Sequence, residues 1–248
     1  MVNVDDIFIK CIKIKLVGAP LVKIEGYQIE NTNTVCPYLK NKIFTSKNFI
    51  VNYLDNEGLE YLLENGYRHF GTYFFKPECS LCKECKPIRI PVDIFNFSRS
   101  DKRVINKNKM FSVNIIDKSE CYEEYFNLYL EHKKRFKEKS EESYDNWKSS
   151  FFEDQSFNKI LEVKDRGHLV AVTHLDVTNN IISAVYCYWN INYSKYSPGK
   201  FSILSGIEKA KKMDIKYYYL GYYIKGNIHM SYKEHYQPNQ ILIDEEWK

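Results

Sequence analysis

The sequence predicts an α+β fold, because strand patterns and helical patterns share the chain without an internal repeat. Two apolar segments, His168–Asp176 and Ile181–Trp189, flank a short polar turn, which is typical of a hairpin. Ser197–Lys212 then shows the apolar stripe of an amphipathic helix. The tyrosine-rich segment Lys216–Ile224 follows and has high strand propensity. We therefore expect a hairpin, a helix and a strand in that order near the end of the chain.

The earlier part of the chain also mixes the two kinds of element. Alternating apolar residues or helical recurrence predict strands or an extended arm within residues 1–30, strands at Ile43–Tyr53, Tyr67–Phe75, Ile88–Phe95 and Phe111–Ile116, and helices at Leu59–Asn65, Glu120–Lys139 and Ser143–Asn158. Asn65 and Gly66 end the first of these helices as an αL cap does. We expect a smaller α+β N-terminal lobe over residues 1–115 and a second domain over 116–248.

Bulk composition indicates a globular chain. Its 248 residues are enough for one large or two small domains, and 44% of them are hydrophobic against 27% charged. The net charge of +4 gives no global field that requires a nucleic acid. No segment has the apolar length of a membrane span, and the N-terminus carries acids where a signal peptide needs bases. We expect a cytoplasmic protein that does not bind membranes.

Three of the seven cysteines form a C-x-x-C-x-x-C pattern at Cys79, Cys82 and Cys85. A reducing compartment argues against disulfides, so the pattern indicates either a metal site or packing. Cys36, brought in by the fold, would be the fourth thiolate of a zinc or iron–sulfur site. The alternative is that these cysteines are small hydrophobic residues in a tight turn, so we assign no metal to the chain and keep the four cysteines as possible ligands.

Four blocks of the sequence resemble, in the same order, those of the aminoacyl-tRNA–protein transferases. They are CPYL at Cys36–Leu39, YFFKPECSLCKECKPIRIPVDIFNFSRSDKRVINKN at Tyr73–Asn108, Asp176 followed by ISAVYCYW at Ile182–Trp189 and GKFSILSGIEKAKK at Gly199–Lys212, and YLGYYIKGNIHMSYKEHYQP at Tyr219–Pro238. Four co-linear blocks across most of a chain are far more specific than one short motif.

The resemblance implies the fold and the reaction. It implies an acyltransferase, N-acetyltransferase-like fold for the C-terminal half. It implies an enzyme that transfers an amino acid, leucine or arginine, from charged tRNA to proteins with an N-terminal Asp or Glu, with an N-degron adaptor and protease downstream. Eukaryotic arginyltransferases carry a second cysteine where Leu39 stands here. That difference and the short chain favour the bacterial leucyltransferase type, and no cofactor besides aminoacyl-tRNA is expected.

The chemistry of this transfer needs no protein nucleophile. Aminoacyl-tRNA is an activated ester, so the protein has to hold amine and carbonyl together, accept a proton and stabilise an oxyanion. Consistent with this, the sequence has no nucleophile elbow and no Walker loop. Asp176 and Tyr222 are the candidate catalytic residues. Asp176 is expected to orient an α-ammonium group or to accept a proton, although it would have no role if it were only an exposed strand-end carboxylate.

Substrate recognition calls for cations and for aromatic rings. The carboxylate of an N-terminal Asp or Glu requires Arg or Lys in a partly desolvated site, for which Arg89, Lys76 and Arg99 are candidates. The alternative for Arg89 is a structural ion pair with Asp93. The matching blocks supply the full set of candidate substrate-binding residues: Tyr38, Lys76, Arg89, Arg99, Tyr186, Lys225, Tyr232 and Lys233.

A basic run at Ser98–Lys109 is the candidate surface for tRNA. Arg99, Arg103 and Lys107 are expected to contact phosphates, with tyrosines available for stacking on bases. A solvated helix face explains such a run equally well. Two other functions stay open. An acetyl-CoA-dependent acetyltransferase would use a glycine-rich loop that Ser197–Lys200 matches poorly, and a non-catalytic RNA-binding module would use the cysteines and the basic runs.

Overall fold

The computed structural model of this chain describes residues 23–29, 31, 33–117, 122–136, 142–152 and 156–248. Two compact units make up the chain. The first comprises Met1–Ile88, Tyr222–His235 and Ile241–Lys248, and the second comprises Arg89–Gly221 and Tyr236–Gln240. None of the helices in the described ranges has the length and apolarity needed to span a bilayer. The prediction of an α+β fold is confirmed. The division of the chain at residues 115 and 116 stays a prediction.

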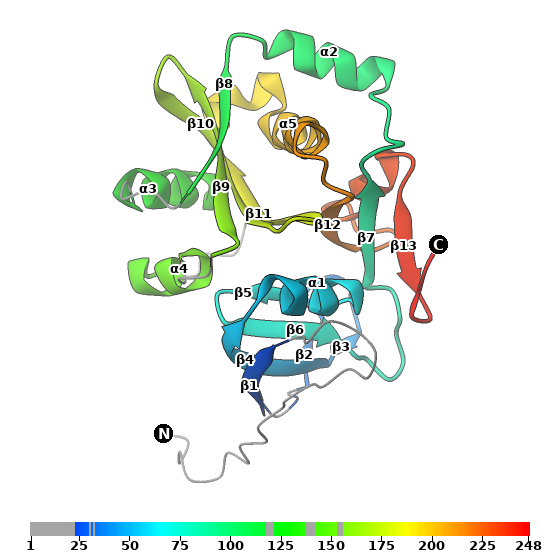
Figure 1. The fold of residues 1–248 in the computed structure, drawn as a ribbon. Helices are drawn as coiled ribbons and strands as arrows, with labels where there is room; N and C mark the ends of the chain where they lie inside the picture. The colour runs from blue at the N-terminus through cyan, green and yellow to red at the C-terminus, as the bar shows by residue number, and fades with distance from the viewer. Residues whose placement is uncertain (1–22, 30, 32, 118–121, 137–141, 153–155) are drawn as a thin grey trace. The chain divides into compact units, whose positions relative to one another are not determined.

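The second unit is a sheet covered by helices on both faces (Figure 1). Its strands follow the order β7-β12-β11-β10-β9-β8, with bounds Lys86–Pro91, Tyr217–Tyr223, Ile181–Trp189, His168–Val177, Asn158–Asp165 and Ser112–Ile116. The pairs β8–β9, β9–β10 and β10–β11 are antiparallel, whereas β11 and β12 run parallel. The helix α5 (Pro198–Lys212) connects these two parallel strands, as a crossover helix must.

The two faces of this sheet carry different helices. Figure 1 shows α3 (Tyr122–Lys133) and α4 (Tyr144–Phe151) on one side and α5 on the other, where α2 (Arg99–Lys107) packs on α5. Under α3 and α4 lies an aromatic core in which Tyr125, Tyr129, Trp147 and Tyr188 are buried. On the opposite face, Gly206 of α5 lets the ring of Tyr218 approach, because a Cβ at Gly206 would lie 2.5 Å from the Tyr218 hydroxyl.

The first unit is built on a smaller antiparallel sheet in the order β1-β4-β6-β5, with bounds Ile24–Ile29, Ser46–Leu54, Tyr73–Pro77 and Arg68–Phe70. The helix α1 (Asn56–Glu64) buries Leu59, Leu62 and Leu63, and Asp55 caps its first turn. Gly66 has a positive φ of 85°, which confirms the glycine-type helix end that the sequence predicts.

Short elements complete the structure. They are the hairpins β2–β3 (Thr34–Val35 and Ile43–Phe44) and β13–β14 (Gln240–Ile243 and Glu246–Trp247), and the 3₁₀ helices η2 (Ile191–Tyr196) and η3 (Ser231–His235). The turn of β13–β14 places both Asp244 and Glu245 at positive φ, 49° and 66°. Two-residue hairpin turns require such angles, which side chains other than glycine adopt at a cost.

Three sequence-based boundaries are wrong. Tyr67–Phe75 is a hairpin of two strands, because Gly71 turns the chain at a φ of 53°. The helical pattern over Ser143–Asn158 ends at Phe151, and the strand β9 begins at Asn158. The predicted helix Glu120–Lys139 ends earlier, because α3 spans Tyr122–Lys133 and residues 134–136 form a turn and a bend. Residues 118–121 and 137–141 lie outside the described residues, as do most of residues 1–30.

Candidate functional site

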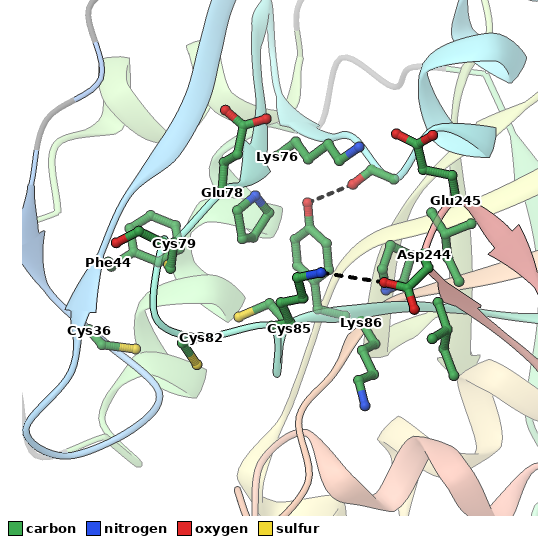
Figure 2. Close-up of a pocket in the computed structure, with 18 of the residues that line it drawn as sticks. Cys36, Phe44, Lys76, Glu78, Cys79, Cys82, Cys85, Lys86, Asp244 and Glu245 are labelled. Atoms are coloured by element: carbon green, nitrogen blue, oxygen red, sulfur yellow. Dashed lines mark hydrogen bonds and ion pairs between the residues drawn. The ribbon is translucent and has the colours of Figure 1, made fainter.

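The first unit contains a pocket of about 520 Å³. Its wall is formed by the Cys36–Phe44 region, the end of α1, the loop from β6 to β7, Tyr222 of β12 and the β13–β14 turn (Figure 2). The turn that the sequence predicts around Cys79, Cys82 and Cys85 is therefore one side of a cavity. Four thiols, those of Cys36, Cys79, Cys82 and Cys85, line it together.

Burial and neighbouring sulfurs favour the protonated form of the Cys85 thiol. Burial, followed by the charges that Cys36, Cys79 and Cys82 would carry as thiolates, raises the pKa of Cys85 to about 12. Cys79 exchanges hydrogen bonds with the backbone of Thr45, at 3.3 Å to its nitrogen and 3.5 Å to its oxygen. A metal site needs thiolates brought to one point. Within the described residues, no three or more Cys, His, Asp or Glu side chains are arranged to hold a metal ion.

Charged side chains of both signs also line the pocket. The cations are Lys42, Lys76, Lys83 and Lys86, and the carboxylates are Glu64, Glu78, Asp244 and Glu245. Lys83 and Asp244 pair at 3.4 Å, but both are largely exposed, so the pair contributes little. The half-buried Lys76 forms no ion pair with another described residue, and its Nζ lies 5.8 Å from the centroid of the Tyr67 ring.

Tyr222 lies at the pocket wall and uses its hydroxyl internally. The hydroxyl donates hydrogen bonds to the carbonyl oxygens of Gly66 at 2.9 Å and Phe75 at 3.3 Å. Burial raises the pKa of Tyr222 well above its ordinary value, although the positive charge of Arg68 opposes this. The group is thus a neutral donor that ties β12 to the end of α1 and to β6. A direct role in proton transfer stays a prediction.

The remaining candidates of the first unit form a group around η3. Lys233 is buried, and its Nζ donates to the Tyr222 carbonyl oxygen at 2.7 Å and approaches the Met230 sulfur at 3.3 Å. Burial lowers its pKa to about 7, with a further contribution from the charge of Arg68. Tyr38 accepts a hydrogen bond from Asn227 at its backbone oxygen. Tyr232 and Lys225 are exposed.

Arg89 of the second unit is buried among aromatic residues. Its Nε donates to Gln240 Oε1 at 2.8 Å, its Nη1 donates to the Tyr219 hydroxyl at 2.9 Å, and its guanidinium carbon lies 3.7 Å from the centre of the Tyr217 ring. Asp93 is exposed and forms no ion pair with Arg89, so the structural pair that the sequence suggested is wrong. Whether Arg89 also meets an acceptor carboxylate stays a prediction.

Asp176 is fully buried rather than exposed at the strand end. It accepts a hydrogen bond from Asn158 Nδ2 at 3.1 Å across the β9–β10 pair, and its charge acts on His174, whose pKa burial lowers to about 3. Direct contact between this carboxylate and a substrate stays a prediction. The sequence missed this burial because it did not predict β9, which covers the end of β10.

Tyr186 belongs to the aromatic group under α3 and α4. Its ring centre lies 5.4 Å from that of Phe151 and 6.1 Å from that of Tyr129. Burial raises the pKa of Tyr186 to about 12. Most of Tyr186 is packed against this core, so stacking on a base would have to use its remaining exposed part.

The helix α2 presents the predicted cations on one face. Arg99, Arg103 and Lys107 follow one another at four-residue spacing and are all exposed. The Lys107 Nζ donates to the Lys195 backbone oxygen at 2.5 Å and lies 5.5 Å from the centroid of the Tyr196 ring. On the other side of the helix, Asp101 caps its start and pairs with Lys200 of α5 at 2.7 Å.

Comparison with known proteins identifies the family. The model of the arginine-tRNA-protein transferase N terminus matches residues 34–103, and that of the C terminus matches residues 118–243. This chain belongs to the arginine-tRNA-protein transferase family. The resemblance that the sequence blocks indicate is therefore confirmed.

Individual members of the family show how far the similarity extends. The chain is 37% identical over 217 residues to an aspartate/glutamate leucyltransferase of Campylobacter jejuni (strain RM1221), covering 84% of this chain and 89% of that protein. It is 34% identical to the aspartate/glutamate leucyltransferase of Pseudomonas fluorescens (strain Pf0-1), covering 75% and 80%. The solved structure of L-PGS from Bacillus licheniformis has a TM-score of 0.48 at 16% identity, covering 74% of this chain and 62% of that one, which is too low to assign a fold.

Proposed function

We propose that this chain transfers leucine from leucyl-tRNA to the N-terminal Asp or Glu of acceptor proteins. The observation that carries the proposal is its similarity, over most of both chains, to proteins named aspartate/glutamate leucyltransferase. The finer predictions belong to the same proposal. They are an acyltransferase-like fold for the second unit, action in the cytoplasm, no cofactor, and an N-degron adaptor and protease that receive the product.

The chemistry of the chain is compatible with this reaction. The leucyl ester is activated when it arrives, so the α-amine of the acceptor attacks its carbonyl carbon, the ribose oxygen leaves and one proton leaves the amine. No covalent enzyme intermediate is required. Because Asp176 is fully buried beside Asn158 and His174, we assign it a positioning role rather than direct contact with a substrate.

The exposed face of α2 is the surface that we assign to tRNA. Arg99 and Arg103 form no ion pair with another described residue, so binding a phosphate breaks no existing pair. Lys107 and Lys195 both lie within about 6 Å of the Tyr196 ring, which places two cations beside a ring that a base can stack on.

Transfer of labelled amino acids tests the proposal. Purified chain is incubated with tRNA charged with labelled leucine or with labelled arginine, and with peptides that begin with Asp, Glu, Lys or Ala. We expect leucine on the Asp and Glu peptides only, and no transfer after RNase treatment. Transfer of arginine instead would assign the arginyl type, and labelling that survives RNase or requires acetyl-CoA would remove the proposal.

A further inference from the structure

The pocket of the first unit is lined by charges of both signs in equal number. Four lysines and four carboxylates share its wall, and Lys83 pairs there with Asp244. Lys76, Glu78 and Glu245 form no ion pair with another described residue, so the pocket offers a free cation and free carboxylates at once.

Lys76 and Glu78 are held on one strand end and act on the same ring. The Lys76 Nζ lies 5.8 Å from the Tyr67 ring centre, and the charge of Glu78 adds to the burial that raises the pKa of Tyr67 to about 12. Lys76 also lies directly opposite Lys47 in the β4–β6 pair, where like charges repel. An anion bound at Lys76 relieves that repulsion, so the position is favourable for a carboxylate.

The β13–β14 turn brings further carboxylates to the pocket at a conformational cost. Asp244 and Glu245 both have positive φ, which aspartate tolerates in such a turn but glutamate does not suit. In Figure 2, Lys76 points along the pocket toward the side where Asp244 and Glu245 lie, with Glu78 at the base of the lysine. Lys76 therefore lies between Glu78 and Glu245, neither of which forms an ion pair with another described residue.

A ligand that complements this lining carries one ammonium and one carboxylate a few bonds apart. The α-ammonium and the side-chain carboxylate of an N-terminal Asp or Glu are such a pair. A cavity of about 520 Å³ is within the ordinary range of small-ligand sites and accommodates the first residues of a peptide. The apolar walls given by Phe44, Pro77 and Leu242 suit the methylene groups of the side chain.

We propose that this pocket binds the N-terminal residue of the acceptor protein, with Lys76 pairing with its side-chain carboxylate and either Glu78 or Glu245 with its α-ammonium group. The assignment rests on the proposed function for the identity of the acceptor. It makes Lys76 the residue that distinguishes Glu from Gln, because a neutral side chain gains nothing from the cation.

Direct binding of dipeptides to the full chain tests the proposal without tRNA. The probes are Glu-Ala, Gln-Ala and N-acetyl-Glu-Ala, titrated by calorimetry or followed by saturation-transfer NMR. We expect the wild-type chain to prefer Glu-Ala over both other probes by about tenfold or more. In Lys76→Gln the affinity for Glu-Ala falls to that for Gln-Ala, and in Lys76→Arg part of the preference returns. In the double variant Glu78→Gln, Glu245→Gln the discrimination against the acetylated probe is lost.

Lys40→Gln is the matched control and is expected to leave the preference for Glu-Ala unchanged. Lys40 is exposed and lies between the lining residues Leu39 and Lys42 in the sequence, but it does not line the pocket itself. An unchanged Glu-to-Gln preference in folded Lys76→Gln overturns the proposal, and so does a wild-type chain that binds no Glu-Ala at millimolar concentration. Competition by leucyl-adenosine but not by Glu-Ala would assign the pocket to the donor instead. The two proposals fail separately, since the transfer assay reports the reaction and the titration reports this pocket.

Discussion

At the scale of single residues, Arg89 shows how a candidate binding residue also holds structure together. Replacing it with alanine leaves the Tyr219 hydroxyl and the Gln240 amide without their donor and removes the cation from the Tyr217 ring. We expect Arg89→Ala to lower the free energy of unfolding by about 2–3 kcal/mol, measured by urea denaturation.

Arg89→Lys is the informative companion variant. It keeps the charge but loses the planar fork, so it is expected to lie between wild type and Arg89→Ala in stability. Stability equal to wild type in Arg89→Ala, together with a reduced preference for Glu over Gln peptides, would contradict the structural role. Arg89 would then take the acceptor role that we assign to Lys76.

Lys233 gives a second prediction at this scale, on the dependence of stability on pH. Its folded pKa is about 7, whereas the unfolded chain holds that proton up to about 10.5. Between these values the unfolded state binds more protons, so stability rises with pH by up to about 1.4 kcal/mol per unit. As pH falls toward 7 this contribution is lost.

Because tyrosines also titrate near pH 10, the measurement is a difference between two proteins. Urea unfolding is followed from pH 6 to pH 10 (roughly the span of the two pKa values) for wild type and Lys233→Met. The wild type is expected to gain stability over Lys233→Met as pH rises, since methionine cannot titrate. Parallel curves would mean that Lys233 keeps its proton in the folded chain.

At the scale of elements, helix α2 carries a prediction about tRNA. Arg99, Arg103 and Lys107 occupy one exposed face of the helix, and each phosphate contact releases condensed counterions. Each single alanine substitution is expected to lower the slope of log affinity against log salt by roughly one unit. The affinity for uncharged tRNA, measured by filter binding at several salt concentrations, gives that slope.

Lys148→Ala is the control for this series. Lys148 is an exposed lysine on α4, which covers the opposite face of the sheet from α5 and α2. Its removal is expected to leave the slope unchanged. Equal slopes for wild type and all three α2 variants would show that the basic face of α2 is solvated and does not contact tRNA phosphates.

Helices, strands and turns could be predicted where the residues that determine them are adjacent in the sequence. The α5 stripe, the β10–β11 hairpin and the glycine at the end of α1 each depend on residues adjacent in sequence, and all three are confirmed. The strand β9 was not predicted, because its apolar residues follow an amphipathic helix without a glycine or proline to mark the boundary. The turn at Gly71 was not predicted either, because a single glycine within an aromatic run is equally compatible with a bulge in one continuous strand.

At the scale of the whole molecule, the chain returns to its first unit after completing the second. The strand β12 ends at Tyr223, and the segments Tyr222–His235 and Ile241–Lys248 belong with residues before Arg89. That return brings Tyr222 and the β13–β14 turn to a pocket that the Cys79–Cys85 loop lines. The sequence blocks named Lys76, Tyr222 and the cysteines, but Glu78, Asp244 and Glu245 carry no local signal, because only tertiary contacts place them there.

The cysteines of that pocket give the last prediction, which concerns the stability of the whole chain. Cys79 exchanges its hydrogen bonds with the Thr45 backbone, and a serine hydroxyl can make the same bonds. Cys79→Ser is therefore expected to lower the free energy of unfolding by only about 1–2 kcal/mol, through lost packing.

If the fold is held by contacts of this kind, a chelator leaves the Tm of the purified chain unchanged, whereas a structural metal contributes directly to the folding free energy. Calorimetry with and without chelator, alongside metal analysis of the same sample, decides between the two. A Tm that collapses on chelation, with one metal equivalent released, would show that the four thiols close around an ion, and Cys79→Ser would then lose far more stability than packing alone explains.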